Sequence, residues 1–108
     1  MTVKQLSEHN EFSIITMPQP EREIKNVYIG DLLSWVMGKA QEDDGWITIM
    51  NNVNVIAVAS LSDTACVILS EGVTLSEDIK STAEKKGVNV LTTEKSTYEA
   101  AVILSGLI

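Results

Sequence analysis

The sequence predicts a single α/β domain that spans residues 1–108. The first observation is that short β-branched runs alternate with apolar helical patterns, most clearly between Asn26 and Gly72. The second is that small polar residues end each run, as in the loops that join strands to helices. The third is size, because 108 residues with a hydrophobic fraction of 44% are enough for one packed core.

The N-terminal half predicts two helices and three strands. Thr2 can cap the first helix, and proline residues end the first β-branched strand. Asp31 is placed to cap the second helix, whose apolar residues recur at helical spacing. The expected elements are a helix at 2–10, a strand at Phe12–Met17, a charged surface connector at Glu21–Lys25, a strand at Val27–Ile29, a helix that ends near Ala40 with an inward stripe of Leu32, Leu33, Val36 and Met37, a solvated turn at 41–45, and a strand at Trp46–Met50.

The C-terminal half predicts further strands and two more helices. Asn51-Asn52 is a turn signal between two closely spaced runs, so we expect a hairpin there rather than a parallel crossover. A helix that Ser76 caps and Gly87 ends lies between two strands, which predicts one parallel β-α-β unit. The expected elements are a strand at Val55–Ala59, a polar loop or helical turn at Ser60–Thr64, a buried strand at Ala65–Leu69, the helix from Ser76 to Gly87, a strand at Val88–Leu91, a loop at Thr92–Lys95, and a last helix, capped by Ser96 or Thr97, that faces inward with Ala100, Ala101, Leu104 and Leu107.

Composition excludes several classes of function. The net charge is −7, and the eight basic residues are scattered, so the chain lacks the basic face that nucleic-acid binding requires. The same acidic balance disfavours anionic membranes, and no apolar run is long enough to span a bilayer. The N-terminus has no apolar signal region, and the lone Cys66 cannot form an internal disulfide. Both features predict a cytoplasmic protein in which Cys66 is a buried small hydrophobe.

No catalytic or metal-binding constellation is visible in the sequence. His9, the only histidine, lies in a polar segment and is expected at the surface. The adjacent carboxylates Glu42-Asp43-Asp44 are typical of a solvated loop rather than of a metal site. No phosphate-binding loop and no GxGxxG is present. We therefore expect no cofactor, no metal and no enzymatic activity; the one local set for catalysis would be Asp63 with Ser60 or Thr64.

Polar residues at strand ends form the candidate ligand site. In parallel sheets, ligands bind at loops that follow the carboxyl ends of strands. Two such loops, Ser70-Glu71-Gly72 and Thr92-Thr93, carry hydroxyl groups and a glycine. Ser60–Thr64 would join them if the strand before it, Val55–Ala59, ended at the same edge. Ordinary loop structure is the alternative interpretation. The candidate ligand-binding residues are Ser60, Asp63, Thr64, Ser70, Gly72, Thr92, Thr93 and Ser96.

Large apolar residues suggest a subunit interface. Trp35, Trp46 and Met50 are bulky for a chain in which only 5% of residues are aromatic. Core packing is one explanation for them. The other explanation is a homodimer that buries these residues between two copies, because Trp and Met are enriched at interfaces.

The order YIGDLLSWVM, WITI, N-VIAVA, VIL-EG and VNVLTTEKSTYEAA resembles the DRTGG domain, which is related to the N-terminal domain of HPr kinase/phosphorylase. The resemblance covers nearly the whole chain and implies a three-layer α/β/α fold with a mixed, mainly parallel sheet. It also implies a dimerising or regulatory role. Short stand-alone members are often encoded near iron-hydrogenase and histidine-kinase genes, which implies another regulatory or redox protein as partner. In larger proteins the domain accompanies CBS nucleotide-sensing modules.

The residues that name the family are mostly replaced in this chain. The resemblance places its Asp at Asp63 and its second Gly at Gly72. Thr64, Ser70 and Glu71 stand at the positions of the Arg, the Thr and the first Gly. We therefore expect a non-enzymatic, homodimeric regulatory module, with a small-ligand sensor for an adenine nucleotide as the alternative.

Overall fold

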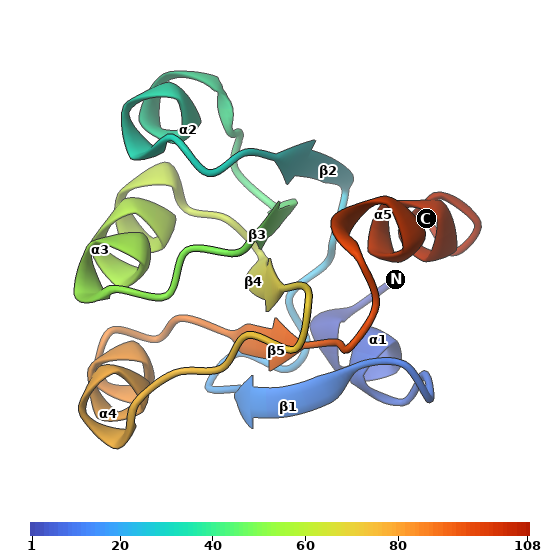
Figure 1. The fold of residues 1–108 in the computed structure, drawn as a ribbon, viewed down its shortest axis with the longest axis horizontal. Helices are drawn as coiled ribbons and strands as arrows, with labels where there is room; N and C mark the ends of the chain where they lie inside the picture. The colour runs from blue at the N-terminus through green and yellow to red at the C-terminus, as the bar shows by residue number, and fades with distance from the viewer.

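Five strands form one mixed sheet in the computed structural model, which describes all residues 1–108 (Figure 1). Four neighbouring strands are parallel, and the strand at one edge is antiparallel to its neighbour. The predicted α/β class with a mixed, mainly parallel sheet is therefore confirmed. In sheet order the strands are β1 (Ser13–Thr16), β5 (Val90–Thr92), β4 (Cys66–Leu69), β3 (Asp44–Thr48) and β2 (Asn26–Ile29).

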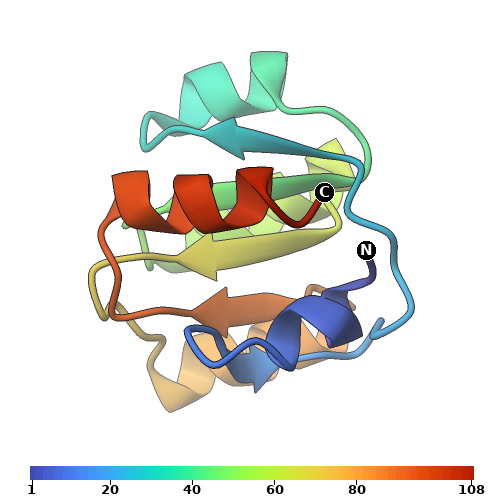
Figure 2. The same cartoon turned by 90° about the vertical axis from the view of Figure 1, so that its right-hand side faces the viewer.

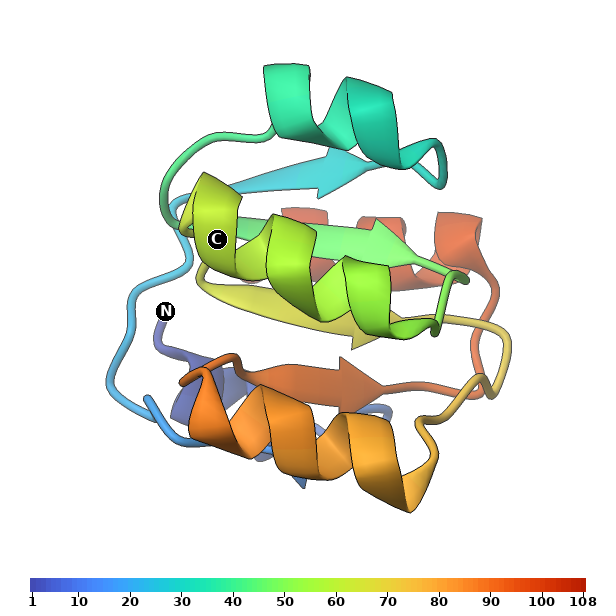
Figure 3. The ribbon, with the colours of Figure 1, turned by 90° about the vertical axis from the view of Figure 1, so that its left-hand side faces the viewer.

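Helices cover both faces of this sheet and complete the predicted α/β/α architecture. Figure 2 shows the face covered by α1 and α5, and Figure 3 shows the face covered by α2, α3 and α4. The last three connect successive parallel strands and share one face, as crossovers of one hand require. No helix has the length and apolar character needed to cross a membrane. The helices are α1 (Val3–Ser7), α2 (Leu33–Lys39), α3 (Val53–Ser62), α4 (Glu77–Lys85) and α5 (Thr97–Ser105).

Three helices begin at the residues that the sequence predicts. Thr2, Ser76 and Ser96 each accept a hydrogen bond from the backbone N–H three residues on. Thr2 and Ser96 also form complete capping boxes. Gly87 follows α4 with a φ of 72°, a left-handed conformation that glycine adopts without strain. Local chemistry therefore sets these boundaries.

The predicted strand at Val55–Ala59 is wrong, because this segment belongs to α3. Asn52 caps the helix by accepting from the Asn54 N–H at 2.9 Å. Four residues of α3 are buried within five positions, so the run is too uniformly apolar to show a helical period. A parallel β3–α3–β4 crossover replaces the predicted hairpin. Ser60–Thr64 contains the last turn of α3 and its left-handed end at Asp63, where φ is 56°.

Asp31 does not cap α2, contrary to the prediction. The helix begins at Leu33, and its N-cap residue Leu32 makes no side-chain capping bond. Asp31 Oδ1 instead accepts from Thr48 Oγ1 at 2.7 Å and from the Ile49 N–H at 3.0 Å. The carboxylate therefore ties the loop after β2 to the loop after β3.

Only part of the predicted apolar stripe of α2 faces the core. Val36 is buried and Leu33 is half-buried, whereas Leu32 and Met37 are exposed. The reason is that α2 is the outermost helix of its layer, at the β2 end of the sheet (Figure 1). Leu107, predicted to face inward, is also exposed because it lies beyond the end of α5.

Two segments predicted as solvated surface contribute to the interior. Ile24, in the connector Glu21–Lys25, is buried. Asp44, in the predicted turn at 41–45, begins β3 and is also buried, with its Oδ2 accepting from the Gln41 N–H at 2.8 Å. Both predictions followed the charged majority of the segment and missed the residue that faces inward.

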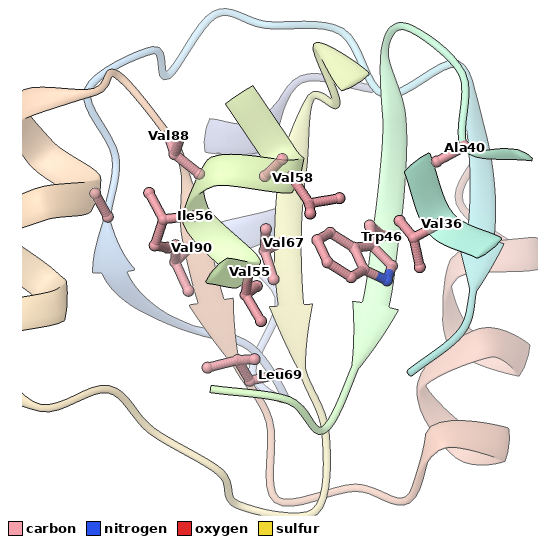
Figure 4. Close-up of a cluster of buried hydrophobic side chains, with 12 residues drawn as sticks. Val36, Ala40, Trp46, Val55, Ile56, Val58, Val67, Leu69, Val88 and Val90 are labelled. Atoms are coloured by element: carbon pink, nitrogen blue, oxygen red, sulfur yellow. The ribbon is translucent and has the colours of Figure 1, made fainter. Parts of the chain in front are cut away.

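The sheet separates two hydrophobic cores. Successive strand residues point to opposite faces, so Trp46 and Val67 pack beneath α2–α4 while Ile47 and Ile68 pack beneath α1 and α5. Trp46 lies among the valines and Ile56 of its core (Figure 4). Its Nε1–H donates to the Gly30 carbonyl at 2.8 Å, so the polar atom of this buried ring is satisfied.

Candidate functional site

The structure divides the candidate ligand-binding residues between the carboxyl edge of the sheet, where the parallel strands end, and the amino edge, where they begin. One group follows the carboxyl ends of β4 and β5, at Ser70–Gly72 and Thr92–Ser96. The other group lies at the end of α3, which contains Ser60, and in the link from that helix to the amino end of β4, which contains Asp63 and Thr64. A helix between parallel strands returns the chain to the opposite edge. These residues therefore do not form one site.

A tight turn occupies the carboxyl end of β4. Glu71 and Gly72 have φ values of 60° and 72°, and the Val73 N–H donates to the Ser70 carbonyl at 3.2 Å, as in a type I′ turn. The Glu71 N–H donates to the Lys95 carbonyl, and the Gly72 N–H to the Thr93 carbonyl, each at 2.8 Å. These amides bind the neighbouring loop, so they are not free to cradle a phosphate.

The hydroxyl groups at this edge also make structural hydrogen bonds. Ser70 Oγ and Thr97 Oγ1 are 2.7 Å apart, and Thr92 Oγ1 donates to the Val73 carbonyl at 2.6 Å. Thr93 Oγ1 accepts from the Lys95 N–H at 3.2 Å. Ser96 caps α5, where its backbone N–H lowers the pKa of the Glu99 carboxyl by hydrogen bonding. The predicted residues therefore hold two loops together.

The cavity in the structure lies at the opposite, amino edge. It encloses about 60 Å³, far below the roughly 300–1,000 Å³ of pockets that enclose drug-sized ligands. The ends of α3 and α4 border it, and its lining is mostly polar. This space is too small to enclose an adenine nucleotide. The lining residues are Gln19, Arg22, Ala59, Ser60, Asp63, Thr64, Lys86, Gly87 and Val88.

Arg22 organises the polar side of this cavity. Its Nε–H donates to Asp43 Oδ1 at 2.9 Å, and one terminal nitrogen donates to the carbonyl and carboxylate of Asp63, at 2.6 and 2.8 Å. Burial opposes the charge of Arg22, but these hydrogen bonds raise its pKa. The sequence predicts Arg22 in a surface connector. Its partners lie 21 and 41 residues away, and no local pattern marks them.

An acid-stability prediction follows from this network. Hydrogen bonds from Arg22 and then Lys25 hold the pKa of Asp43 below its usual value. Ionised Asp43 therefore stabilises the fold above the unfolded-state pKa of about 3.9, and this contribution is lost as pH falls through the lower folded-state value. We expect Asp43→Asn to lower the free energy of unfolding at pH 7 by on the order of 1 kcal/mol, with the difference from wild type vanishing once the pH falls below the lowered folded-state pKa of Asp43.

Urea unfolding between pH 2 and pH 7 measures this difference. Asparagine tolerates the positive φ of 68° at position 43, so the substitution changes mainly the charge. Glu42→Gln is the matched control, because Glu42 is an exposed neighbouring carboxylate for which the structure shows no ion pair. A difference between wild type and Asp43→Asn that stayed constant across this range would contradict the role of the charge.

The chemically reactive side chains are engaged elsewhere. His9 Nδ1 accepts from the Glu11 N–H at 3.2 Å, and its ring packs edge-on against Phe12. Cys66 is fully buried, which raises its thiol pKa to about 12. No group of three or more His, Cys, Asp or Glu side chains is placed to hold a metal ion.

The candidate interface residues also separate in the structure. Trp46 is fully buried in its own chain, so it is not available to a partner. Met50 is half-buried against the same core. Trp35 is 61% exposed on α2, with Lys39 Nζ 5.7 Å from its ring centroid. The sequence did not predict that other large apolar residues are exposed; these are Leu32 and Met37, at the N-cap and within α2, and Ile29 on β2.

Comparison with known proteins agrees with this fold. The model of the DRTGG domain matches residues 13–107. A similar solved structure is the crystal structure of the CBS and DRTGG domains of the regulatory region of Clostridium perfringens pyrophosphatase, complexed with the activator diadenosine tetraphosphate. The TM-score is 0.68 at 17% identity, and the match covers 86% of this chain and 41% of that one. This chain thus spans less than half of that structure, and the likeness shows a shared fold.

A comparison with curated proteins gave no significant match. The family match runs from β1 through α5, so it includes every strand of the sheet and four of the five helices. The resemblance inferred from the sequence is thereby confirmed. The chain belongs to the DRTGG domain family.

Proposed function

We propose that residues 1–108 form one non-catalytic regulatory module, which acts in the cytoplasm as a homodimer and through contact with a partner protein. The observation that carries this proposal is the exposure of large apolar residues on α2 and at its N-cap. Leu32, the N-cap residue, is 63% exposed, and Trp35 and Met37 of the seven-residue helix are 61% and 54% exposed. Exposed large apolar side chains, tryptophan above all, are characteristic of interaction surfaces.

A regulatory role also agrees with the family. The similar pyrophosphatase structure is a regulatory region that contains a DRTGG domain. In this chain the backbone amides of Glu71 and Gly72 and the hydroxyls of the loops after β4 and β5 bind other parts of the fold. As the partner we propose another regulatory or redox protein, on the basis of the resemblance described above.

The homodimer is tested by the mass in solution. We expect sedimentation equilibrium at tens of micromolar to give twice the monomer mass of 11.8 kDa. Trp35→Ala should shift the equilibrium toward monomer by at least tenfold in dissociation constant, because it removes a large contact area. Ile14→Thr is the matched control, since Ile14 is 50% exposed on the opposite edge strand. A monomeric wild type, or equal dissociation constants for all three proteins, would refute this interface.

The second candidate is an adenine-nucleotide sensor. Its support is that the similar regulatory region was crystallised with diadenosine tetraphosphate as activator. The small cavity and the bonded loops of this chain favour the first proposal. Thermal unfolding with adenine nucleotides at millimolar concentration separates the two. A ligand at 100 times its dissociation constant should add about 2.7 kcal/mol, a shift of several degrees. A melting temperature that is the same with and without each nucleotide would rule out the sensor function.

A further inference from the structure

We propose that two copies of this chain pair antiparallel through β2, with Tyr28 of one copy opposite Tyr28 of the other, so that their sheets become continuous. This inference rests on the proposed homodimer and names the contact that builds it. It is drawn from the free edge of β2, the charges at its ends and the apolar residues beside it.

The backbone of β2 offers hydrogen bonds on its outer side. β2 is an edge strand that pairs only with β3. The Gly30 N–H donates to the Ile47 carbonyl at 3.2 Å, so the even-numbered residues of β2 face β3. Backbone groups alternate along a strand, and the N–H and C=O of Val27 and Ile29 therefore point outward. In Figure 1 this free side of β2 opens between α2 and α5.

The other edge of the sheet is protected. β1 has a register shift between Ile14 and Thr16, and Pro18 follows it. Bulges and prolines are common devices that prevent an edge strand from pairing with another chain. β2 has neither, since its register with β3 is unbroken and it contains no proline. Of the two edges, β2 is the one suited to pairing.

Charge selects an antiparallel second copy. Lys25 and Asp31 carry opposite charges and lie just beyond the two ends of β2, three residues on either side of Tyr28. Antiparallel pairing about Tyr28 sets Lys25 of each copy opposite Asp31 of the other, so two opposite-charge pairs form. Lys25 is 69% exposed, and Asp31 uses only Oδ1 within its own chain. The Lys25 ammonium already bonds Asp43, but it has three donors and can serve both carboxylates.

The neighbouring registers lack this complementarity. In this pairing, residues whose backbone groups point outward must lie opposite one another. The nearest alternative registers are therefore those in which Val27 or Ile29, and not Tyr28, lies opposite its own copy. A centre at Val27 places Glu23 opposite Asp31, which brings like charges together. A centre at Ile29 leaves both charges opposite apolar residues. The register about Tyr28 is therefore favoured.

The same register buries the exposed apolar residues. Val27 packs toward α1 and α5, while Tyr28 packs toward α2, so Ile29 shares the face of Val27. In the dimer each Ile29, 48% exposed in one chain, lies opposite Val27 of the other copy. A four-residue strand alone buries less than the roughly 800 Å² per partner of a stable interface. The two α2 helices, with Leu32 and Trp35, flank the contact and supply further area.

Single-cysteine cross-linking tests the register. Tyr28 faces β3, so two opposed Tyr28 positions form a close, non-hydrogen-bonded pair with Cα atoms about 4.5 Å apart, within disulfide range. Tyr28→Cys should therefore give a covalent dimer under mild oxidation. Asn26→Cys is the matched control, because its two copies would be separated by about 13 Å along the strands. The buried Cys66 does not interfere.

Each outcome decides a different point. Stronger cross-linking of Val27→Cys or Ile29→Cys would overturn the register. No cross-link at any of these positions, in a protein that sediments as a dimer, would overturn pairing through β2 and leave the homodimer intact. A monomer would end both proposals.

A second measurement uses the unmodified protein and needs no substitution at Tyr28. Carbodiimide couples an amine to a neighbouring carboxylate. Treatment of a mixture of ¹⁴N-labelled and ¹⁵N-labelled chains should give a cross-linked peptide in which Lys25 of one isotopic form is joined to Asp31 of the other. The absence of that peptide from the covalent dimer would overturn the proposed charge pairing.

Discussion

Replacing Trp46 by alanine is expected to lower the free energy of unfolding by about 3–5 kcal/mol, the largest effect among the substitutions considered. The ring is fully buried in the core beneath α2–α4, so truncation leaves a cavity at its centre. It also leaves the Gly30 carbonyl without the indole donor. Urea unfolding followed by circular dichroism, at fixed protein concentration, measures the loss.

Trp46→Phe is the matched control. It keeps most of the apolar volume and removes only the indole N–H and one ring. Its free energy of unfolding should therefore fall by about half as much as that of Trp46→Ala. If Trp46→Ala kept wild-type stability and became monomeric, Trp46 would belong to an interface and the described core would be wrong.

Replacing Asn89 by alanine is expected to cost roughly 2–4 kcal/mol. Asn89 Nδ2–H groups donate to the Gln19 and Ala65 carbonyls at 2.8 and 2.9 Å, and its Oδ1 accepts from the Gln19 N–H at 2.8 Å. The side chain therefore holds the segment after β1 against the amino edge of the sheet. Alanine would remove the partner of the Gln19 N–H and the Asn89 donor to the Ala65 carbonyl, and it would leave the Gln19 carbonyl with only the Arg22 N–H, beside a side chain that is itself buried.

Gln19→Ala separates this role from the side chain of Gln19. The variant keeps both backbone groups that bond Asn89 and removes only the bond from Gln19 Nε2 to the Gly87 carbonyl. We expect the free energy of unfolding of Gln19→Ala to fall by less than about 1 kcal/mol. Hydrogen exchange should show the Gln19 amide less protected in Asn89→Ala than in wild type. Equal losses for the two variants would contradict the proposed role of Asn89.

The predicted strand at Val55–Ala59 allowed Ser60–Thr64 to join the candidate ligand-binding residues only if that strand ended at the same edge as β4 and β5. Ser60–Thr64 directly precede β4, so they lie at its amino end. Val55–Ala59 lies in a helix, so it returns the chain to the amino edge before β4 begins. Ser60, Asp63 and Thr64 therefore lie at the opposite edge from Ser70 and Thr92, and the two groups do not form one site.

Exposure was equally difficult to predict for the aromatic residues. Trp35 and Trp46 are both large and apolar, and the local pattern does not distinguish them. Trp46 lies on a central strand under three helices, whereas Trp35 lies on the outermost helix of that layer. The position of an element within the sheet therefore decided which tryptophan can meet a partner.

The sequence by itself determined the α/β class, the family and most element boundaries. Thr2, Ser76 and Ser96 cap helices by bonding amides three residues away, and such short-range chemistry needs no tertiary structure. The tertiary structure alone decided the partners of polar side chains that bond across the fold. Asp31, Arg22 and Asn89 find theirs from 17 to 70 residues away, because packing of the strands and helices brings distant backbone groups within hydrogen-bond distance.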